Sequence, residues 1–172
     1  MRHTEAAVLK AIPTLLVIGS IFGMAGTFVP SDSWRGVFWG IDGAALIVAT
    51  ALLTIHYFRL GQDVVAAGFL VFVAGETLIL SGAAMELRSS VPVFGAGAAL
   101  WAASLILVSV PKVMPAWVRV TGILAAILFA FVALHIFMGF ALSPLSHPLP
   151  FFAYPFLVAT LLGWAWVQHR RT

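Results

Sequence analysis

The chain has 172 residues, of which 62% are hydrophobic and 9% are charged, and its formal net charge at neutral pH is +3. A soluble domain of this size would lack the polar residues needed to cover its surface, whereas a lipid bilayer requires apolar helices of about 20 residues. The chain has no cysteine, which excludes disulfides, thiolate metal sites and cysteine nucleophiles. The composition therefore predicts an integral membrane protein.

Six apolar stretches follow one another along the chain, and each is long enough to cross a bilayer as a helix. Their expected bounds are 6–29, 35–59, 63–87, 91–111, 117–142 and 149–168. Turn-forming residues such as Pro30 and Gly61 separate them. Short connections make consecutive helices antiparallel neighbours. We therefore expect an all-α polytopic membrane protein in which residues 1–172 form a single domain of six transmembrane helices, arranged as three antiparallel hairpins.

Basic residues are distributed unequally between the two ends of these expected helices. Arg35 and Arg88 lie at one end. Seven lie at the end that holds the N-terminus: Arg2, Lys10, Arg59, Lys112, Arg119, Arg170 and Arg171. The positive-inside rule places the more basic end in the cytoplasm. We therefore expect both termini to be cytoplasmic and the protein to lie in the bacterial cytoplasmic (inner) membrane.

A short triplet recurs on the second, fourth and sixth stretches. It reads Val48–Thr50, Ala102–Ser104 and Val158–Thr160, with one small or β-branched residue, one alanine and one hydroxyl residue in each case. One interpretation is that three helical hairpins share an ancestor. The other is coincidence, because alanine, valine and threonine are common in any membrane helix.

Four ionisable residues fall clearly inside the apolar stretches: Asp42, His56, Glu76 and His135. Each costs about 2.5 kcal/mol or more at the centre of a span unless something compensates it, so such residues are functional candidates by default. Counting at about 1.5 Å per residue puts Asp42 and His135 at one level in the outer half, with Glu76 roughly a turn deeper. We expect these three to converge on one buried site that relays protons or binds a ligand.

Two further residues have secondary places in this expected site. His56 lies near the cytoplasmic end of the second stretch, and Trp101 is the tryptophan that falls in the middle of a span. Helical phase puts Asp42 and His56 on one stripe of the second helix, with small residues between them. That stripe should face the inside of the bundle, towards Glu76 on the third helix.

Glycines mark the faces on which helices are expected to pack closely. Gly68, Gly75 and Gly82 recur every seven residues on the third stretch, and Gly19 and Gly23 form a GxxxG pair on the first. Small residues allow the backbones of membrane helices to approach one another.

A purely structural interpretation exists for each polar candidate. Glu76 can be a neutral acid that bonds a hydroxyl or carbonyl group, Asp42 a hydrated residue of an outer vestibule, and His135 a ring bonded to one carbonyl. His56 can be an interfacial side chain. The aromatic run 151–156 is interpreted as packing.

Several chemistries are excluded by residue type and position. A bis-histidine haem needs both rings at one level, whereas His56 and His135 lie in opposite leaflets. No HExxH motif, phosphate loop or dinucleotide fingerprint occurs. Asp42, Glu76 and His135 are acceptable as metal ligands by type, but no paired ligand motif supports a metal site, so we expect no metal and no cofactor. We also expect no nucleic acid partner, and an enzymatic function is the least favoured of the alternatives.

Two function classes remain. The first is proton-linked transport of a small solute or ion, with Glu76 as the group that exchanges protons near the midplane. The alternative is a non-catalytic accessory subunit or stress-related membrane protein that binds lipid, quinone or a partner helix. In either case the bilayer is the immediate partner, and a small solute, a proton or a lipid-like ligand is expected, with a homo-oligomer or a larger membrane complex as possible assemblies.

Overall fold

The computed structural model describes residues 2–170, with side chains described from residue 10 onward. Within that range the chain is helical and contains no strand. The helices are α1 (Arg2–Phe28), α2 (Asp32–Arg59), α3 (Asp63–Ala83), α4 (Val91–Ser109), α5 (Ala116–Phe137), the short 3-10 turn η1 (Phe151–Ala153) and α6 (Tyr154–His169). Six spans are long and apolar enough to cross a membrane. The chain is thus an integral membrane protein built as a six-helix bundle.

Glycine decides where two of these helices end. Gly61, the second residue after α2, has φ of +68°, and Gly139, the second residue after α5, has φ of +93°. The left-handed region favours glycine because glycine has no Cβ, so a helix commonly ends just before such a residue, with one capping residue between. Gly139 explains why α5 ends at Phe137 and not at 142. The expected third and sixth spans are also too long: α3 ends at Ala83, and α6 begins at Tyr154.

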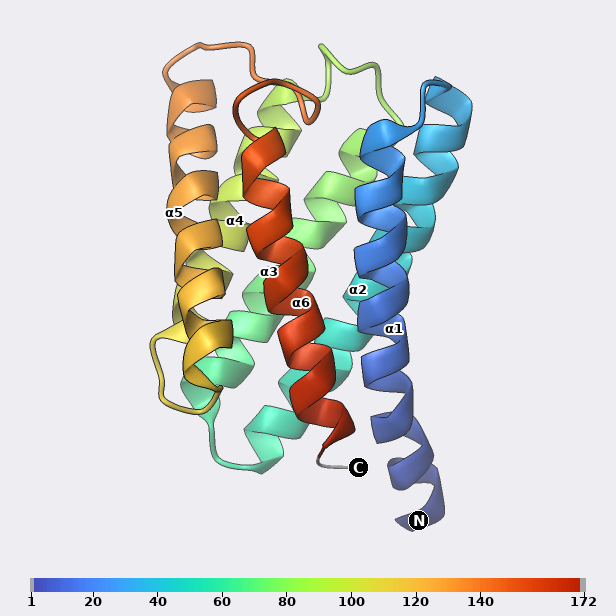
Figure 1. The fold of residues 1–172 in the computed structure, drawn as a ribbon, viewed down its shortest axis with the longest axis vertical. Helices are drawn as coiled ribbons and strands as arrows, with labels where there is room; N and C mark the ends of the chain where they lie inside the picture. The colour runs from blue at the N-terminus through green and yellow to red at the C-terminus, as the bar shows by residue number, and fades with distance from the viewer. Residues whose placement is uncertain (1, 171–172) are drawn as a thin grey trace.

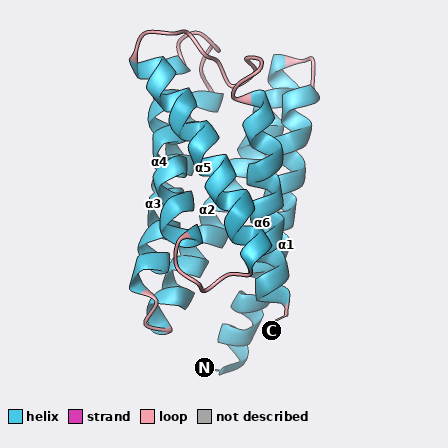
Figure 2. Ribbon diagram, turned by 60° about the vertical axis from the view of Figure 1, so that its left-hand side comes forward, coloured by secondary structure: helices cyan, strands magenta, loops and turns pink. Residues whose placement is uncertain are grey.

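The six helices form a closed ring. Each helix packs against the one before and the one after it, and α1 also packs against α6. Consecutive helices run in opposite directions, and α6 lies between α5 and α1 (Figure 1). We call the end where α1 begins and α6 ends the near end, and the opposite end the far end. Long connections cross the far end, the longest of them between α5 and α6 (Figure 2).

Arginine side chains secure connections at both ends. At the far end, Arg35 is buried and donates to the Asp32 carboxylate (2.5 Å) and to the Val29 carbonyl (2.9 Å). At the near end, Arg119 donates to the Ser109 and Val110 carbonyls, which terminate α4. Cations suit the carbonyl ends of helices. Of the seven basic residues counted at the near end, the Arg2 side chain and Arg171 lie outside the described residues.

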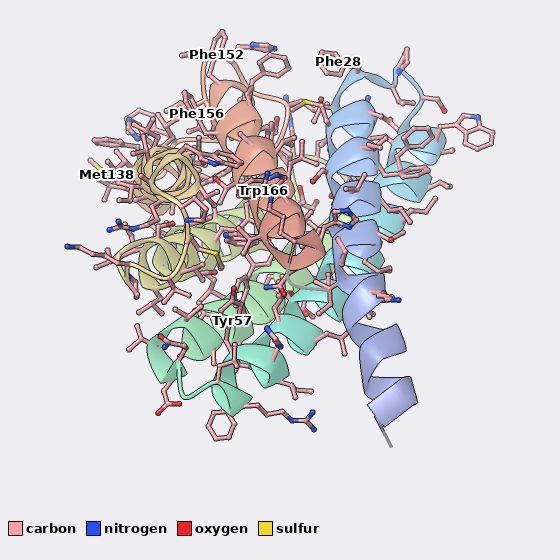
Figure 3. The ribbon with its side chains drawn as sticks, turned by 60° about the horizontal axis from the view of Figure 1, so that its bottom comes forward. Phe28, Tyr57, Met138, Phe152, Phe156 and Trp166 are labelled. Atoms are coloured by element: carbon pink, nitrogen blue, oxygen red, sulfur yellow. The ribbon has the colours of Figure 1, made fainter. Side chains whose placement is uncertain are left out.

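Aromatic rings fill the inside of the ring of helices. We define the aromatic core by six residues that contact one another in a chain from α2 to α6: Tyr57, Phe69, Phe72, Trp101, Phe129 and Trp164. Tyr57 stacks on Phe69 with ring centroids 5.4 Å apart, and Trp164 meets Phe69 edge-on at 4.8 Å. Figure 3 shows Tyr57 inside the bundle and Met138 and Phe152 at its periphery. The aromatic core therefore blocks the interior towards the near end.

The recurring triplets place their hydroxyl residues alike. Thr50, Ser104 and Thr160 are all fully buried. Thr50 donates to the Leu46 carbonyl and Thr160 to the Phe156 carbonyl, each one turn back along its own helix. The two threonine hydroxyls are thus satisfied within their own helices, which is how membrane helices commonly tolerate them, whereas the Ser104 hydroxyl has no hydrogen-bond partner among the described residues.

Candidate functional site

A cavity lies inside the ring of helices in its far half. The centres of water-sized molecules can occupy about 80 Å³ of it, which is room for several waters. Its wall is formed by α1, α2, α3, α4 and α6, together with residues of the far-end connections. The wall includes Trp39 and Asp42 of α2, Trp101 of α4 and Tyr154 of α6. α5 contributes no residue to the part of the wall that the structure describes.

The Asp42 carboxyl group lies between α2 and α1, at the cavity wall. A Cβ atom added to Gly23 of α1 would sit 2.7 Å from Oδ2 of Asp42, so the glycine leaves the space that the carboxyl fills. Among the described residues, no donor forms a hydrogen bond to this carboxyl. An acid in a membrane span normally has a partner. Asp42 is therefore a polar group with unused hydrogen-bonding capacity that faces the cavity.

Glu76 lies deeper in the protein and has one defined partner. Its side chain is only 1% exposed, and the Trp101 indole Nε1 donates a hydrogen bond of 3.0 Å to its Oε2. Helices α3 and α4 approach each other closely at this point. A Cβ added to Gly75 of α3 would lie 3.1 Å from Trp101 Cδ1 and 3.2 Å from the Gly97 carbonyl oxygen, both on α4. The cavity reaches Trp101 but not Glu76 itself. The indole therefore stands between the cavity and the deeper acid.

The ionisable groups of Asp42, Glu76 and Tyr154 lie within electrostatic reach of one another. The carboxyl groups of Asp42 and Glu76 are close enough to interact, and the Tyr154 hydroxyl is close enough to interact with both. The Tyr154 hydroxyl donates a hydrogen bond of 2.8 Å to the Pro144 carbonyl. This bond ties the far-end connection to α6 beside the cavity. No lysine, arginine or histidine belongs to the wall as described. The site thus gathers acids without a basic side chain beside them.

His135 does not join the acids, and the sequence-based expectation is wrong on this point. Its side chain is exposed on the outside of α5, and its Nδ1 donates to the Phe131 carbonyl of its own helix at 2.7 Å. It shares this outer stripe with Phe131 and Leu124, while Phe129, Val132 and other residues of α5 face inward. Counting along the helix predicts a level for His135 but not the direction in which its ring points.

His56 lies at the near end, beyond the aromatic core. Its ring meets the Tyr57 ring edge-on at 5.3 Å. Tyr57 in turn accepts a hydrogen bond of 3.1 Å from the Gln168 side-chain amide, and Gln168 is only 2% exposed. These residues make a second polar group on the inside of the bundle. The structure therefore separates His56 from Asp42 and Glu76 and does not bring it into their site.

The glycines singled out from the sequence lie at helix contacts. Gly19 faces Leu46 of α2, with 2.5 Å between an added Cβ and the Leu46 Cδ2 atom. Gly68 faces Val108 of α4 at 2.7 Å, measured in the same way. Gly82 has more room, since its nearest neighbour is the Ser90 Cβ atom at 3.6 Å. On α3 the contact is therefore tighter at Gly68 than at Gly82, which lies nearer the far end.

Sequence reasoning missed Tyr154 and Gln168. Tyr154 was included in an aromatic run that was interpreted as packing, although its hydroxyl bonds Pro144 and its ring meets Phe129 at 5.9 Å. One signal was available: the chain has only two tyrosines, Tyr57 and Tyr154, and a phenol inside a span needs a hydrogen-bond partner. Both tyrosines hold such a partner on the inside of the bundle.

No protein-family model matches the chain, and no curated protein or solved structure is significantly similar to it.

Proposed function

We propose that the protein carries out proton-linked transport of a small solute or ion across the bacterial cytoplasmic membrane, with both termini in the cytoplasm. The observation that carries this proposal is the cavity wall, which holds the Asp42 carboxyl group without a hydrogen-bond donor. A second acid, Glu76, lies on the other side of the Trp101 indole. A carboxyl group that served only to join helices would be fully bonded. Asp42 is instead available to a proton or solute that enters from the far end.

Asp42 and Glu76 have different parts in the proposed cycle. Asp42 faces the cavity and meets the solute or proton first. Glu76 holds a proton in the interior, and its partner is suited to that task because an indole can only donate. The Trp101 N–H can bond to an oxygen of the neutral acid and to the carboxylate alike. A proton can thus leave Glu76 without loss of the bond that fixes the side chain.

The aromatic core serves in this proposal as the closed barrier. Phe72 and Trp164 pack beneath the cavity at 5.7 Å, and Tyr57 and Gln168 bond at the near end. Solute in the cavity is thereby cut off from the near end. Transport requires a second arrangement in which these rings part and the far end closes, and His56 then lies on the cytoplasmic side of the path.

Reconstitution into vesicles with a pH-sensitive dye inside tests the proposal. We expect the wild-type protein to move protons when a solute gradient is applied, and Glu76→Gln and Asp42→Asn to reduce that flux at least tenfold while the variants stay folded. Glu86→Gln is the matched control, because Glu86 is an exposed acid in the far-end connection between α3 and α4. Wild-type protein that moves neither protons nor any solute of a broad panel would refute transport and favour the accessory role.

A further inference from the structure

We propose that the cavity binds a small organic cation, a protonated or methylated amine, with Asp42 as its counter-ion. This inference rests on the proposed function only for the coupling to protons. The binding itself follows from the wall of the cavity. Its first ground is charge: the described wall contains the Asp42 carboxyl and no basic side chain. An anion would enter a site with no compensating charge, which is costly in an apolar interior.

The second ground is the aromatic surface around the acid. Trp39, Trp101 and Tyr154 all line the cavity. The faces of such rings attract organic cations, and aromatic rings around an acid are the usual surroundings of a bound ammonium group. Trp39 already accepts a cation in this way, because the Arg35 guanidinium carbon lies 5.9 Å from its ring centroid.

The third ground separates an organic cation from a metal ion. Hard cations such as Ca²⁺ and Mg²⁺ require about six or more oxygen ligands. The described wall offers one carboxylate, Asp42, and its serine and threonine hydroxyls are each held against a backbone carbonyl of their own segment: Ser20 at Leu16, Thr27 at Met24 and Ser90 at Leu87. Most of the remaining wall consists of aliphatic and aromatic carbon. A cation that presents its own methyl or methylene groups matches this surface, whereas a bare ion does not.

Charge balance then links binding to proton movement. Among the described residues, the ionisable groups within electrostatic reach of Asp42 are Glu76 from α3 and Tyr154 from α6, and the residues of α1 on the cavity wall are uncharged. An ammonium group that binds to a protonated Asp42 must displace its proton to form an ion pair. One proton then leaves for each cation bound, and exchange in the opposite direction completes the cycle.

Binding of choline to the full chain in lipid nanodiscs tests the inference, with 3,3-dimethylbutan-1-ol as its uncharged analogue of the same shape. Titration calorimetry in two buffers of different ionisation enthalpy gives the affinity and the number of protons released. We expect saturable binding of choline with proton release, and at least tenfold weaker binding of the analogue. Asp42→Asn should remove choline binding, and Glu86→Gln should leave it unchanged.

A second variant protects the test if Asp42→Asn fails to fold. Trp39→Leu removes one aromatic face, and loss of a cation–π contact of about 1–2 kcal/mol weakens binding by about 5- to 30-fold. Equal binding of choline and its analogue would overturn the inference, as would absence of binding by choline, methylammonium and tetramethylammonium. If either result were found while proton flux still depended on Glu76, the cation site would be refuted and the proposed transport function would stand. If the cation bound but no proton or solute flux occurred, transport would be refuted and the cation site would stand.

Discussion

The carboxyl group of Asp42 fills the space that Gly23 leaves open on α1. An added Cβ would lie 2.7 Å from Oδ2 and 2.9 Å from Cγ of Asp42, so no larger residue fits at position 23 while the carboxyl keeps its place. Gly26, one turn along α1, makes room in the same way for the Trp39 ring, at 2.5 Å from Cδ1. The glycine face of α1 thus positions two side chains of the proposed cation site.

Gly23→Ala should therefore displace Asp42 and damage the site. We expect a destabilisation of about 1–3 kcal/mol, as for other overpacked positions, and a loss of both choline binding and proton flux. Gly40→Ala on α2 is the matched control, because a Cβ there meets no atom within 4 Å. Unfolding in detergent micelles and calorimetry in nanodiscs measure the two effects. If Gly23→Ala binds choline as the wild type does, the placement of Asp42 against α1 is wrong.

The hydrogen bond between Trp101 and Glu76 predicts a non-additive pair of substitutions. Trp101→Phe leaves a buried acid without its donor, which should cost about 1–3 kcal/mol beyond the loss of packing. In a Glu76→Leu background the same substitution removes no hydrogen bond, and its cost should fall by that amount. The free energy of unfolding of the four proteins gives the coupling directly. Additive costs would show that the bond contributes nothing to stability.

His135→Leu should be nearly silent. The ring is exposed on α5 and bonds only to the Phe131 carbonyl of the same helix, so leucine removes no contact between helices. We expect proton flux within twofold of the wild type and a change in unfolding free energy of at most about 0.5 kcal/mol. A large loss of flux in the vesicle assay would restore His135 as a member of the site.

The bond between Gln168 and Tyr57 predicts a leak when it is broken. Gln168→Leu should cost about 1 kcal/mol, since it removes one buried hydrogen bond that joins α6 to α2. In the proposed transport cycle this bond helps to hold the aromatic core closed at the near end, so passive proton leak into vesicles should also rise. Tyr57→Phe should have the same effect on stability and leak, and the double variant should differ little from either single variant.

Thr77→Ala is the control, because Thr77 is exposed and donates only to the Val73 carbonyl of its own helix. An unchanged leak would contradict the role of the near-end bond as a barrier.

The number of spans and their order were predictable because bilayer thickness leaves few alternatives for long apolar stretches. The ends of the helices were less predictable. Gly61 is the last small residue before a polar turn and was recognised, whereas Gly139 lies inside an apolar stretch and was not. Hydropathy measures whether a residue tolerates lipid, and Gly139 and its neighbours do so without being helical.

The inward direction of the two acids was predictable, whereas the outward direction of His135 was not recognised. The Asp42 stripe and the Gly75 contact put two acids on the inside, because small residues mark packed faces in membrane helices. The same rule applied to α5 would have excluded His135: Gly122, Ala125 and Ala126 are buried, and bulky residues such as Phe131 face outward. In a bilayer, large apolar side chains do not mark the inside, since lipid accommodates them equally well.

The closure of the ring by α6 has a consequence for biosynthesis. α6 carries Tyr154, Leu157 and Leu161 of the cavity wall and packs against both α1 and α5, yet it follows the other five helices in the chain. During synthesis Asp42 and Glu76 therefore enter the membrane before the wall that shields them exists. Until α6 packs between α1 and α5, the cavity lacks the wall that α6 supplies, and Asp42 lies on an incomplete surface. The cavity is therefore complete only when the last helix of the chain has packed against the first.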